Sequence, residues 1–332
     1  MVSAIKKLGA DYVFDVTFAA DLTITEEASE LVKRIQNKQV LPQFTSCCPA
    51  WVKYCEMFYP EFIPNLSSAK SPISMLGATI KTYFAKERNI DPANIINVSI
   101  APCTAKKYEI QRPELRDSGY QDTDYILTTR ELAKWIKEEN IDFLSLEDSK
   151  FDDMFSKGTG AGVIFGNTGG VMEAALRTAY YYITKQTPPQ GLLNFMPVRG
   201  MEEIKEAQVE IAGITLKVAV AHGMSNAKKL LDELKKGNVQ YHFIEIMNCK
   251  GGCIGGGGQP KITLLNMEST KKARIKSIYN EDDKMVKRLS HENPDVINIY
   301  KEFYTEPLSP KAEKLLHTTY TDKSDMLKGK EV

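Results

Sequence analysis

Apolar and polar residues alternate along the chain with two different periods, which together predict strands alternating with helices. Apolar residues recur at the spacing of an amphipathic helix over residues 25–38, 49–62, 71–88, 128–141 and 226–238. Short apolar runs typical of buried strands occupy residues 94–103 and 241–247, and a strand-like run opens residues 11–23. This order of elements predicts an α/β fold.

Glycines mark turns between further elements in the second half of the chain. Residues 160–182 predict a strand, a glycine turn and a helix, and residues 209–223 predict a hairpin that turns at Ala212 and Gly213. Helices are expected over much of residues 283–318. We therefore expect a single domain of two lobes, residues 1–150 and 151–332. Each lobe would be a small, mostly parallel sheet flanked by helices.

Composition and charge exclude several broad classes of function. Lys plus Arg and Asp plus Glu both total 43 among 332 residues, so the formal net charge is zero. This balance gives no electrostatic case for binding nucleic acid or an anionic membrane. The sequence has no run of about 18 apolar residues and no signal-peptide pattern near Met1, which predicts a cytoplasmic protein.

Six cysteines stand out against this background, because in a reducing compartment cysteines more often bind metals or act in catalysis than form disulfides. Cys47 and Cys48 are adjacent, and neighbouring cysteines rarely bridge each other, since the ring they close is strained. The pair is either an accident of a buried turn or a pair of thiols with two separate roles. Cys55 has the helical spacing of a core residue.

The other cysteines follow predicted strands, where sites in open α/β sheets form. Cys103 ends the apolar run 94–103, and Cys249 follows the run 241–247 and opens a glycine-rich stretch, "CKGGCIGGGGQP". Such a loop lets the backbone approach an inorganic cluster and donate hydrogen bonds to its sulfurs. Four thiolates, Cys48, Cys103, Cys249 and Cys253, fit a [4Fe–4S] cubane in a cleft between the lobes, although a four-cysteine zinc site is an alternative.

Nucleotide binding has little support in the sequence. No G-x-x-x-x-G-K-[ST] segment occurs, and the glycines do not form G-x-G-x-x-G between a strand and a helix. The stretch "GNTGG" at residues 166–170 has two interpretations, a phosphate-binding turn or an ordinary strand-to-helix turn, and we favour the second.

Three long segments, "TSCCPAW" (45–51), "APCTAKKYE" (101–109) and "EIMNCKGGCIGGGGQP" (245–260), resemble the signature segments of [FeFe]-hydrogenase catalytic domains. Intervening stretches such as "NLSSAKSP" and "SHENP" resemble the same family. The resemblance implies a cluster in which a [4Fe–4S] cubane is joined through one cysteine to a di-iron centre with carbonyl, cyanide and a bridging azadithiolate. Such domains interconvert protons, electrons and dihydrogen.

Carried over by position, the resemblance implies a role for each cysteine of the site. Cys48, Cys103, Cys249 and Cys253 would bind the cubane, and Cys253 would be shared with the di-iron unit. Cys47 would exchange protons with the bridging amine.

The resemblance also implies a proton relay from Cys47 to the surface, which runs through Glu27, Ser67, Glu30 and Arg34. Glu27, Glu30 and Arg34 would share one helix face. Without the resemblance, these acids are better interpreted as residues that stabilise a helix N-terminus.

Further residues are implied to surround the di-iron unit. Lys106 would hold a cyanide ligand and Met247 would pack beside the bridging carbonyl, whereas a surface lysine and a core methionine are the simpler interpretations. Ser71, Pro72 and Phe165 would line the pocket. The chain departs from the family pattern at three positions near the cysteines, which we expect to alter the redox tuning of the cluster: Ala101, Asn248 and Lys250.

The resemblance also bears on partners. No cysteine-rich ferredoxin-like extension is present, so an external ferredoxin-like donor would supply electrons, and maturation proteins would insert the di-iron unit. Family domains usually have a further segment before "LGADYVFD", so we expect either a minimal form or a fragment whose N-terminal piece or partner subunit is supplied elsewhere. The alternatives to catalysis are a regulatory sensor and a cubane-only relative that works in iron–sulfur assembly.

Overall fold

A computed structural model describes residues 1–328. The larger of its two sheets has four strands. Its strands lie in the order β1 (Gln43–Phe44), β6 (Phe243–Met247), β5 (Ile214–His222) and β4 (Ile204–Ile211). β1 and β5 both run parallel to β6, whereas β4 is antiparallel to β5. The carboxyl ends of β1 and β6 therefore meet at one edge of the sheet, where the sites of α/β proteins form.

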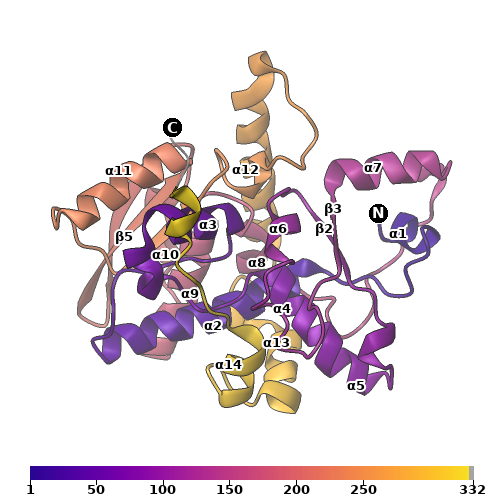
Figure 1. Ribbon diagram of the computed structural model, residues 1–332, viewed down its shortest axis with the longest axis horizontal. Coiled ribbons are helices and arrows are strands. Elements are labelled where there is room, and N and C mark those ends of the chain that lie inside the picture. Colours follow the sequence, from indigo (N-terminus) through magenta and orange to yellow (C-terminus); the bar gives the residue numbers. More distant parts are fainter. Residues whose placement is uncertain (329–332) are drawn as a thin grey trace.

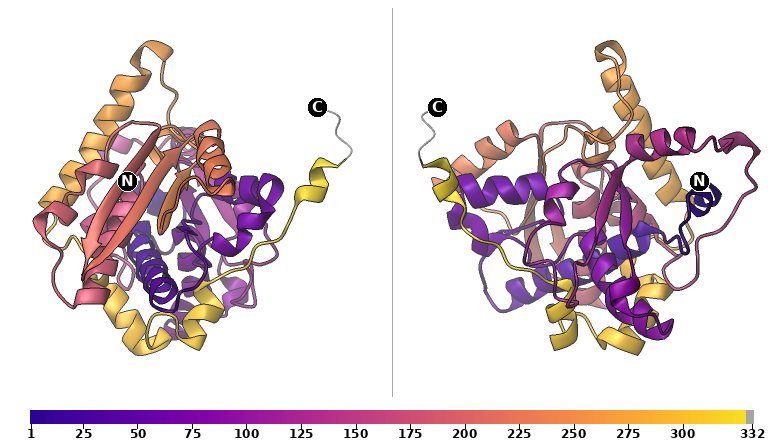
Figure 2. Two further views of the ribbon diagram at one scale, coloured as in Figure 1. Left: turned by 90° about the vertical axis from the view of Figure 1, so that its left-hand side faces the viewer. Right: turned by 45° about the vertical axis from the view of Figure 1, so that its right-hand side comes forward.

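Helices cover both faces of this sheet, as the left-hand view of Figure 2 shows. On one face, Phe243 and Met247 of β6 pack in a core with α2 (Val16–Gln36) and α9 (Gly170–Thr184). On the other face, Ile244 and Ile246 pack against α3 (Pro49–Phe58) and α11 (Met224–Lys235). Every residue of β6 is buried, as expected of a parallel strand with apolar cores on both sides.

A separate two-stranded parallel sheet joins β2 (Val98–Ala101) to β3 (Tyr125–Thr128). After β3 the chain enters α7 (Thr129–Glu138), which begins with a capping box. The Thr128 hydroxyl accepts a hydrogen bond from the Glu131 N–H, and the Glu131 carboxylate accepts one from the Thr128 N–H. The sharp start of α7 fixes the carboxyl end of β3.

The remaining helices pack around these sheets (Figure 1), and α12 stands out from the body of the molecule. The α-helices are α1 (Val2–Lys7), α4 (Pro72–Thr79), α5 (Ala85–Glu87), α6 (Lys106–Glu109), α8 (Gly160–Ile164), α10 (Gln190–Leu193), α12 (Met267–Lys284), α13 (Pro294–Ile299) and α14 (Pro310–Leu316). Short π-helical segments continue α4 over Ile80–Phe84 and α13 over Tyr300–Tyr304. A third apolar core joins α2, α4, α13 and α14.

The expected α/β class, with small, mostly parallel sheets flanked by helices, is confirmed. The predicted hairpin is also confirmed, because Ala212 and Gly213 both have positive φ, as a two-residue hairpin turn requires. The larger sheet takes β1 from the first part of the chain and its other strands from residues 204–247. The division into lobes at residue 150 stays a prediction.

Two strand predictions were wrong. Residues 11–15 form no strand, and α2 begins at Val16, where the Asp15 carboxylate caps the helix by accepting the Thr17 N–H. The apolar run after Gly160 forms the helix α8 instead of a strand. A Cβ on Gly162 would lie 2.7 Å from the Thr17 carbonyl oxygen, so the missing side chain lets α8 pack against α2.

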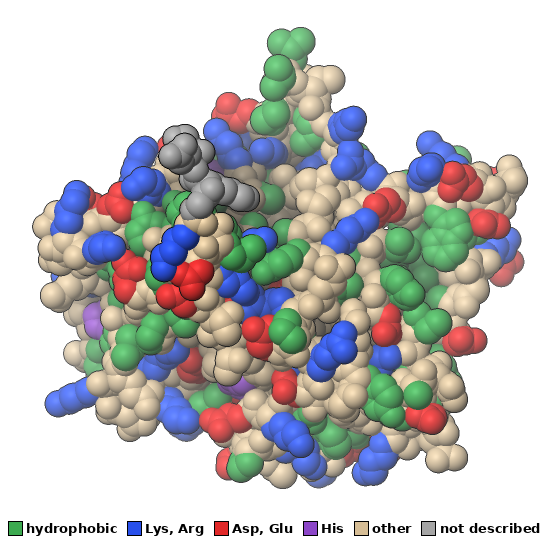
Figure 3. Space-filling view, viewed as in Figure 1, with side chains coloured by type: hydrophobic (Ala, Val, Ile, Leu, Met, Phe, Trp, Pro, Cys, Tyr) green, Lys and Arg blue, Asp and Glu red, His purple; other side chains and the backbone are tan. Residues whose placement is uncertain are grey.

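The surface agrees with the balanced composition. Acidic and basic side chains are intermixed over the face that Figure 3 shows. Within the part of the chain that the structure describes, no helix combines the length and apolar character needed to cross a bilayer.

Candidate metal centre

Cys103 and Cys249 follow strand ends, as the sequence predicts, and Cys48 lies shortly after a strand that the sequence analysis did not predict. Cys48 follows β1 and occupies the N-cap of α3, ahead of Pro49 at the first helical position. Cys103 follows β2, and Cys249 follows β6. These strands belong to both sheets, so the site takes cysteines from each.

The glycine-rich segment 249–260 connects the two sheets through backbone hydrogen bonds. The Gly258 N–H donates to the Pro102 carbonyl at 2.8 Å, and the Arg130 N–H donates to the Gly258 carbonyl at 3.2 Å. At Gly252, a Cβ would lie 2.6 Å from the backbone nitrogen of Thr168. With φ of 89°, only glycine fits there comfortably, and the loop that carries Cys253 is held close to residues 166–168.

The four candidate ligands, Cys48, Cys103, Cys249 and Cys253, form one electrostatic group. Burial, followed by the neighbouring Cys48 and Cys103, raises the pKa of the Cys249 thiol to about 11. Burial and the other three cysteines raise the pKa of Cys253 as well. Burial and the neighbouring cysteines thus oppose ionisation of the Cys48, Cys249 and Cys253 thiols, and a bound metal would favour their thiolate forms.

This arrangement fits a cluster of several irons. A cubane binds each cysteine to a different iron, so its four sulfurs stand apart around it. The Asn248 N–H also points at Cys48 Sγ, 3.5 Å away, in the manner of the hydrogen bonds that tune cluster sulfurs.

The adjacent cysteines occupy different environments. Cys48 packs against the core beside α3, whereas Cys47 packs against the opposite core, together with Phe165 and Met247. Burial, and then the nearby Glu27, raise the pKa of the Cys47 thiol well above its ordinary value. Cys55 lies in the core beside α3 and points its thiol at the Tyr59 carbonyl.

Lys106 is buried, and its ammonium group donates to the Cys47 carbonyl at 3.0 Å and to Glu109 Oε2 at 2.6 Å. The interpretation as a surface lysine is therefore wrong. Burial alone would lower the pKa of Lys106, but the Glu109 carboxylate outweighs burial and holds the pKa above its ordinary value. Sequence reasoning missed Glu109, although its i, i+3 spacing from Lys106 on one short helix was a usable signal.

The other predicted pocket residues lie at or next to the ends of helices and strands. Ser71 is the N-cap of α4, and its hydroxyl donates to Glu109 Oε2 at 3.1 Å. Pro72 opens α4, and Phe165 ends α8. Met247 ends β6 and is buried in the core with Cys47. The structure thus brings Ser71 close to the Lys106–Glu109 pair and groups Met247 and Phe165 with Cys47.

The predicted relay residues form a chain of contacts inside the molecule. Glu27 is buried, and its Oε2 has no hydrogen-bond partner among the described residues. Burial, then Glu30, raise the pKa of Glu27 to about 8, while the Ser67 hydroxyl moderates the rise. The Ser67 hydroxyl donates a hydrogen bond to Glu30 Oε2 at a distance of 2.8 Å. Arg34 completes the series with hydrogen bonds from Nη2 and Nε to Glu30 Oε1, at 2.6 and 3.1 Å.

A surface pocket lies at the far end of this series. Its volume is about 510 Å³, and Glu30 and Arg34 line it together with Lys33, Ser68, Glu313 and His317. Arg34 is held at the pocket by further hydrogen bonds to backbone carbonyls, among them that of Leu66 at 2.9 Å. The contacts therefore lead from the surroundings of Cys47 to an opening large enough for water.

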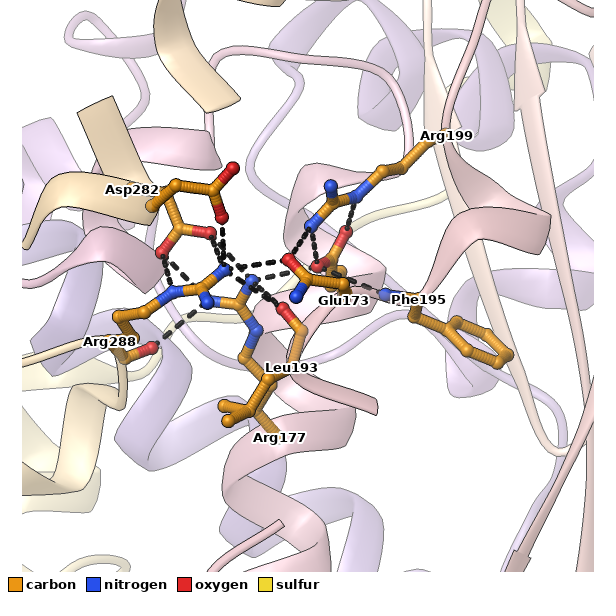
Figure 4. A network of polar contacts seen from close by, with 9 residues as sticks. Glu173, Arg177, Leu193, Phe195, Arg199, Asp282 and Arg288 are labelled. Atoms are coloured by element: carbon orange, nitrogen blue, oxygen red, sulfur yellow. Dashed lines mark hydrogen bonds and ion pairs between the residues drawn. The ribbon is translucent and has the colours of Figure 1, made fainter. Parts of the chain in front are cut away.

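A buried ionic network, shown in Figure 4, joins α9 to α12. Arg177 of α9 pairs with Glu173 at 2.7 Å and with Asp282 of α12 at 2.8 Å, and all three side chains are fully buried. Arg199 also pairs with Glu173, and Arg288 also pairs with Asp282. These ion pairs hold α12 against α9, which packs on the larger sheet.

Comparison with known proteins identifies the family. Residues 1–257 match the model described as iron-only hydrogenase large subunit, C-terminal domain, and residues 268–323 match that of the iron hydrogenase small subunit. Iron hydrogenase 1 of Clostridium pasteurianum is 45% identical over 320 residues, which are 96% of this chain and 55% of that protein. The periplasmic [Fe] hydrogenase large subunit of Nitratidesulfovibrio vulgaris is 52% identical over 262 residues, 78% of this chain and 62% of that protein.

Structural comparison gives the same family. An apo [FeFe]-hydrogenase from Chlamydomonas reinhardtii matches with a TM-score of 0.83 at 40% identity, over 97% of this chain and 87% of that one.

Another relative by sequence is a different kind of protein. Cytosolic iron-sulfur assembly component 3 of Mus musculus is 31% identical over 332 residues, 96% of this chain and 68% of that protein. This chain spans about half the length of several curated hydrogenases that it matches. The chain belongs to the family defined by the C-terminal domain of the iron-only hydrogenase large subunit, and a segment of the small-subunit family follows that domain.

Proposed function

We propose that this chain is the catalytic part of an [FeFe]-hydrogenase that interconverts protons and dihydrogen. The observation that carries the proposal is the series Glu27, Ser67, Glu30 and Arg34, which leads from the surroundings of Cys47 to a surface pocket. A cluster that only transfers electrons has no need of such a series. The reaction proposed here consumes or releases protons in the interior, so it needs one.

In this proposal, Cys48, Cys103, Cys249 and Cys253 bind the [4Fe–4S] cubane, and Cys253 is shared with the di-iron unit. When bound, the di-iron unit with its carbonyl, cyanide and azadithiolate ligands supplies the place where protons and electrons combine to dihydrogen, and the cubane relays the electrons. The protein binds and shields this group. Lys106 and Ser71 present polar groups to it, and Pro72, Phe165 and Met247 shape the apolar side of the pocket.

Proton movement is assigned to the chain's own side chains. In this proposal the thiol of Cys47, the residue next to the ligand Cys48, exchanges a proton beside the cluster. Glu27, with its pKa raised to about 8, is mostly protonated near neutral pH and can both give and take a proton there. Its buried Oε2 has no hydrogen-bond partner among the described residues, and in this proposal it exchanges the proton with Cys47. From Ser67 the proton passes to Glu30 and out past Arg34.

The proposal includes partners and location. An external ferredoxin-like protein would exchange electrons with the cubane, and maturation proteins would insert the di-iron unit. We also propose a cytoplasmic location, because a reducing compartment would keep the ligand cysteines as thiols until the cluster is inserted. Cell fractionation with an antibody to the chain would test this location, and recovery outside the cytoplasm would contradict it.

A role in iron–sulfur assembly is the second candidate, since an assembly component of that kind is 31% identical over nearly the whole chain. Such a role needs a cubane but no di-iron unit. Infrared spectroscopy separates the two, because metal-bound carbonyl and cyanide absorb where proteins do not. After a reconstituted cubane protein is treated with a synthetic di-iron complex and washed, we expect these bands to remain. Their absence, with the cubane intact, would favour the assembly role.

The infrared bands do not separate a catalytic hydrogenase from a sensory member of the family, because a sensor would also carry the di-iron unit and show the bands. The intact relay argues against a sensor, since slow sensing needs no fast supply of protons. Turnover measured on the loaded protein decides between them.

A further inference from the structure

Lys271 is a buried cation on α12 without a carboxylate partner in the part of the chain that the structure describes. Its side chain is only 8% exposed. The next residue, Lys272, is paired with Glu268 at 2.7 Å, and Arg274 donates to the Ile254 carbonyl at 2.8 Å. An ammonium group on a largely buried residue with no carboxylate partner loses part of its hydration without gaining a counter-charge, so a nearby anion would stabilise Lys271.

The end of the Lys271 side chain lies over the turn that carries Cys253. A Cβ built on Gly255 would be 3.2 Å from Lys271 Cε and 3.4 Å from Nζ. Lys271 is also close enough to Cys249 to favour the thiolate of that cysteine. The other charges that act on Lys271 are Lys250 and Arg274, which are both positive. The cation therefore lies against Gly255, in the turn that begins at Cys253, and near the proposed ligand Cys249, while its remaining charged neighbours repel it.

A cubane held by four thiolates carries a net negative charge, and its potential depends on the charges around it. We propose that Lys271 is the counter-charge of the cubane and raises its reduction potential. This inference rests on the proposed function, because it assumes a cubane at Cys48, Cys103, Cys249 and Cys253. When an external reductant adds one electron, the cluster becomes more negative, so a nearby cation stabilises the reduced form more than the oxidised form.

The experiment uses the full chain with a reconstituted cubane and no di-iron unit, so its readout is independent of turnover. The midpoint potential is measured by titration with dithionite, with the reduced cubane detected by electron paramagnetic resonance. Lys271→Met removes the buried charge. Lys272→Met removes the same charge one residue further along the same helix, but from an exposed surface pair. Lys271→Arg keeps the charge.

We expect Lys271→Met to lower the ratio of reduced to oxidised cubane at a fixed potential about tenfold, which is ~59 mV for a one-electron couple. This size follows from two unit charges about 10 Å apart at an effective dielectric constant near 20. Lys272→Met and Lys271→Arg should stay close to the wild-type potential. An unchanged potential in Lys271→Met with an intact cubane would overturn the proposal, and so would an equal shift in Lys272→Met.

Loss of the cluster is also informative. If Lys271→Met and Lys271→Gln both lose iron while Lys271→Arg keeps it, the positive charge is required to hold the cluster, which supports the counter-charge role. If Lys271→Arg loses iron as well, packing rather than charge is responsible and the proposal is overturned. A wild-type chain that binds no cubane at all would instead contradict the proposed function, so the two failures are distinct.

Discussion

Ser67 and Glu30 are joined by a buried hydrogen bond of 2.8 Å, from the Ser67 hydroxyl to Glu30 Oε2. Glu30 belongs to α2, whereas Ser67 lies in the segment that leads from α3 to α4. The bond connects Glu27, near Cys47, with Glu30, which lines the surface pocket. If protons follow this route, they must pass through the Ser67 hydroxyl, so removing this one group tests the route.

Ser67→Ala removes this hydroxyl and should lower the turnover of the loaded enzyme by about 10²-fold or more, the usual range for a lost proton-transfer group. The matched control is Ser68→Ala. The Ser68 hydroxyl bonds to His317, and only its backbone N–H contacts Glu30, so this variant leaves the route intact. Dihydrogen production by both variants, normalised to iron content, is the measurement. Equal rates in the two variants would remove Ser67 from the route.

Glu27 gives a prediction for the dependence of stability on pH. The unfolded chain releases the Glu27 proton near pH 4.5, whereas the folded chain keeps it to about pH 8. Between these values the folded state binds more protons, so the free energy of unfolding falls as pH rises. Glu27→Gln cannot titrate and should lose less stability between pH 5 and pH 8. Urea unfolding of both proteins across this range is the check, and parallel curves would show that the pKa of Glu27 is not raised.

The cysteines are predicted to differ sharply in their effect on iron binding. Serine at position 48, 103, 249 or 253 should prevent a stable cubane from forming, because each position supplies one thiolate. Cys55→Ser is the control, since Cys55 lies in an apolar core. Cys47→Ala should also keep the cubane. Iron and sulfide analysis after reconstitution measures this. Wild-type iron content in any of the four ligand variants would reassign that ligand.

Arg177 is predicted to be essential for stability. Arg177→Met leaves the buried carboxylates of Glu173 and Asp282 short of a counter-charge, which should cost about 3–5 kcal/mol of unfolding free energy. Lys134→Met breaks an exposed pair with Glu138 and should cost no more than about 0.5 kcal/mol. Denaturant unfolding of the two variants compares them. Similar losses would mean that the network contributes little beyond a surface ion pair.

The positions of the cysteines were largely predictable from the sequence. Apolar runs before Cys103 and Cys249 indicated strands, but these strands, β2 and β6, belong to different sheets, and the sequence did not show how the two sheets are arranged. The apolar stretch after Gly160 was misassigned, because a short run of small apolar residues fits a strand and a buried helix equally well. Only the contact of Gly162 with α2 decides for the helix.

Contacts between residues that are distant in the sequence could not be predicted. The pairing of Arg177 with Asp282 joins α9 to α12, and no local pattern indicates it. The unpaired state of Lys271 is equally invisible, because Lys271 and Lys272 look alike in the sequence while only one of them reaches an acidic partner among the residues that the structure describes. Such differences depend on the packing of α12 against the cysteine loop, which the chain acquires only on folding.

The most direct test of the account is dihydrogen evolution from reduced viologen, by protein that carries a reconstituted cubane and an added synthetic di-iron complex. The wild-type chain should evolve dihydrogen, and Cys47→Ala, with the same iron content, should be slower by about 10²-fold or more. Absence of activity in the wild type with confirmed iron loading would contradict the proposed hydrogenase function. Equal rates in the two proteins would contradict the proton route through Cys47.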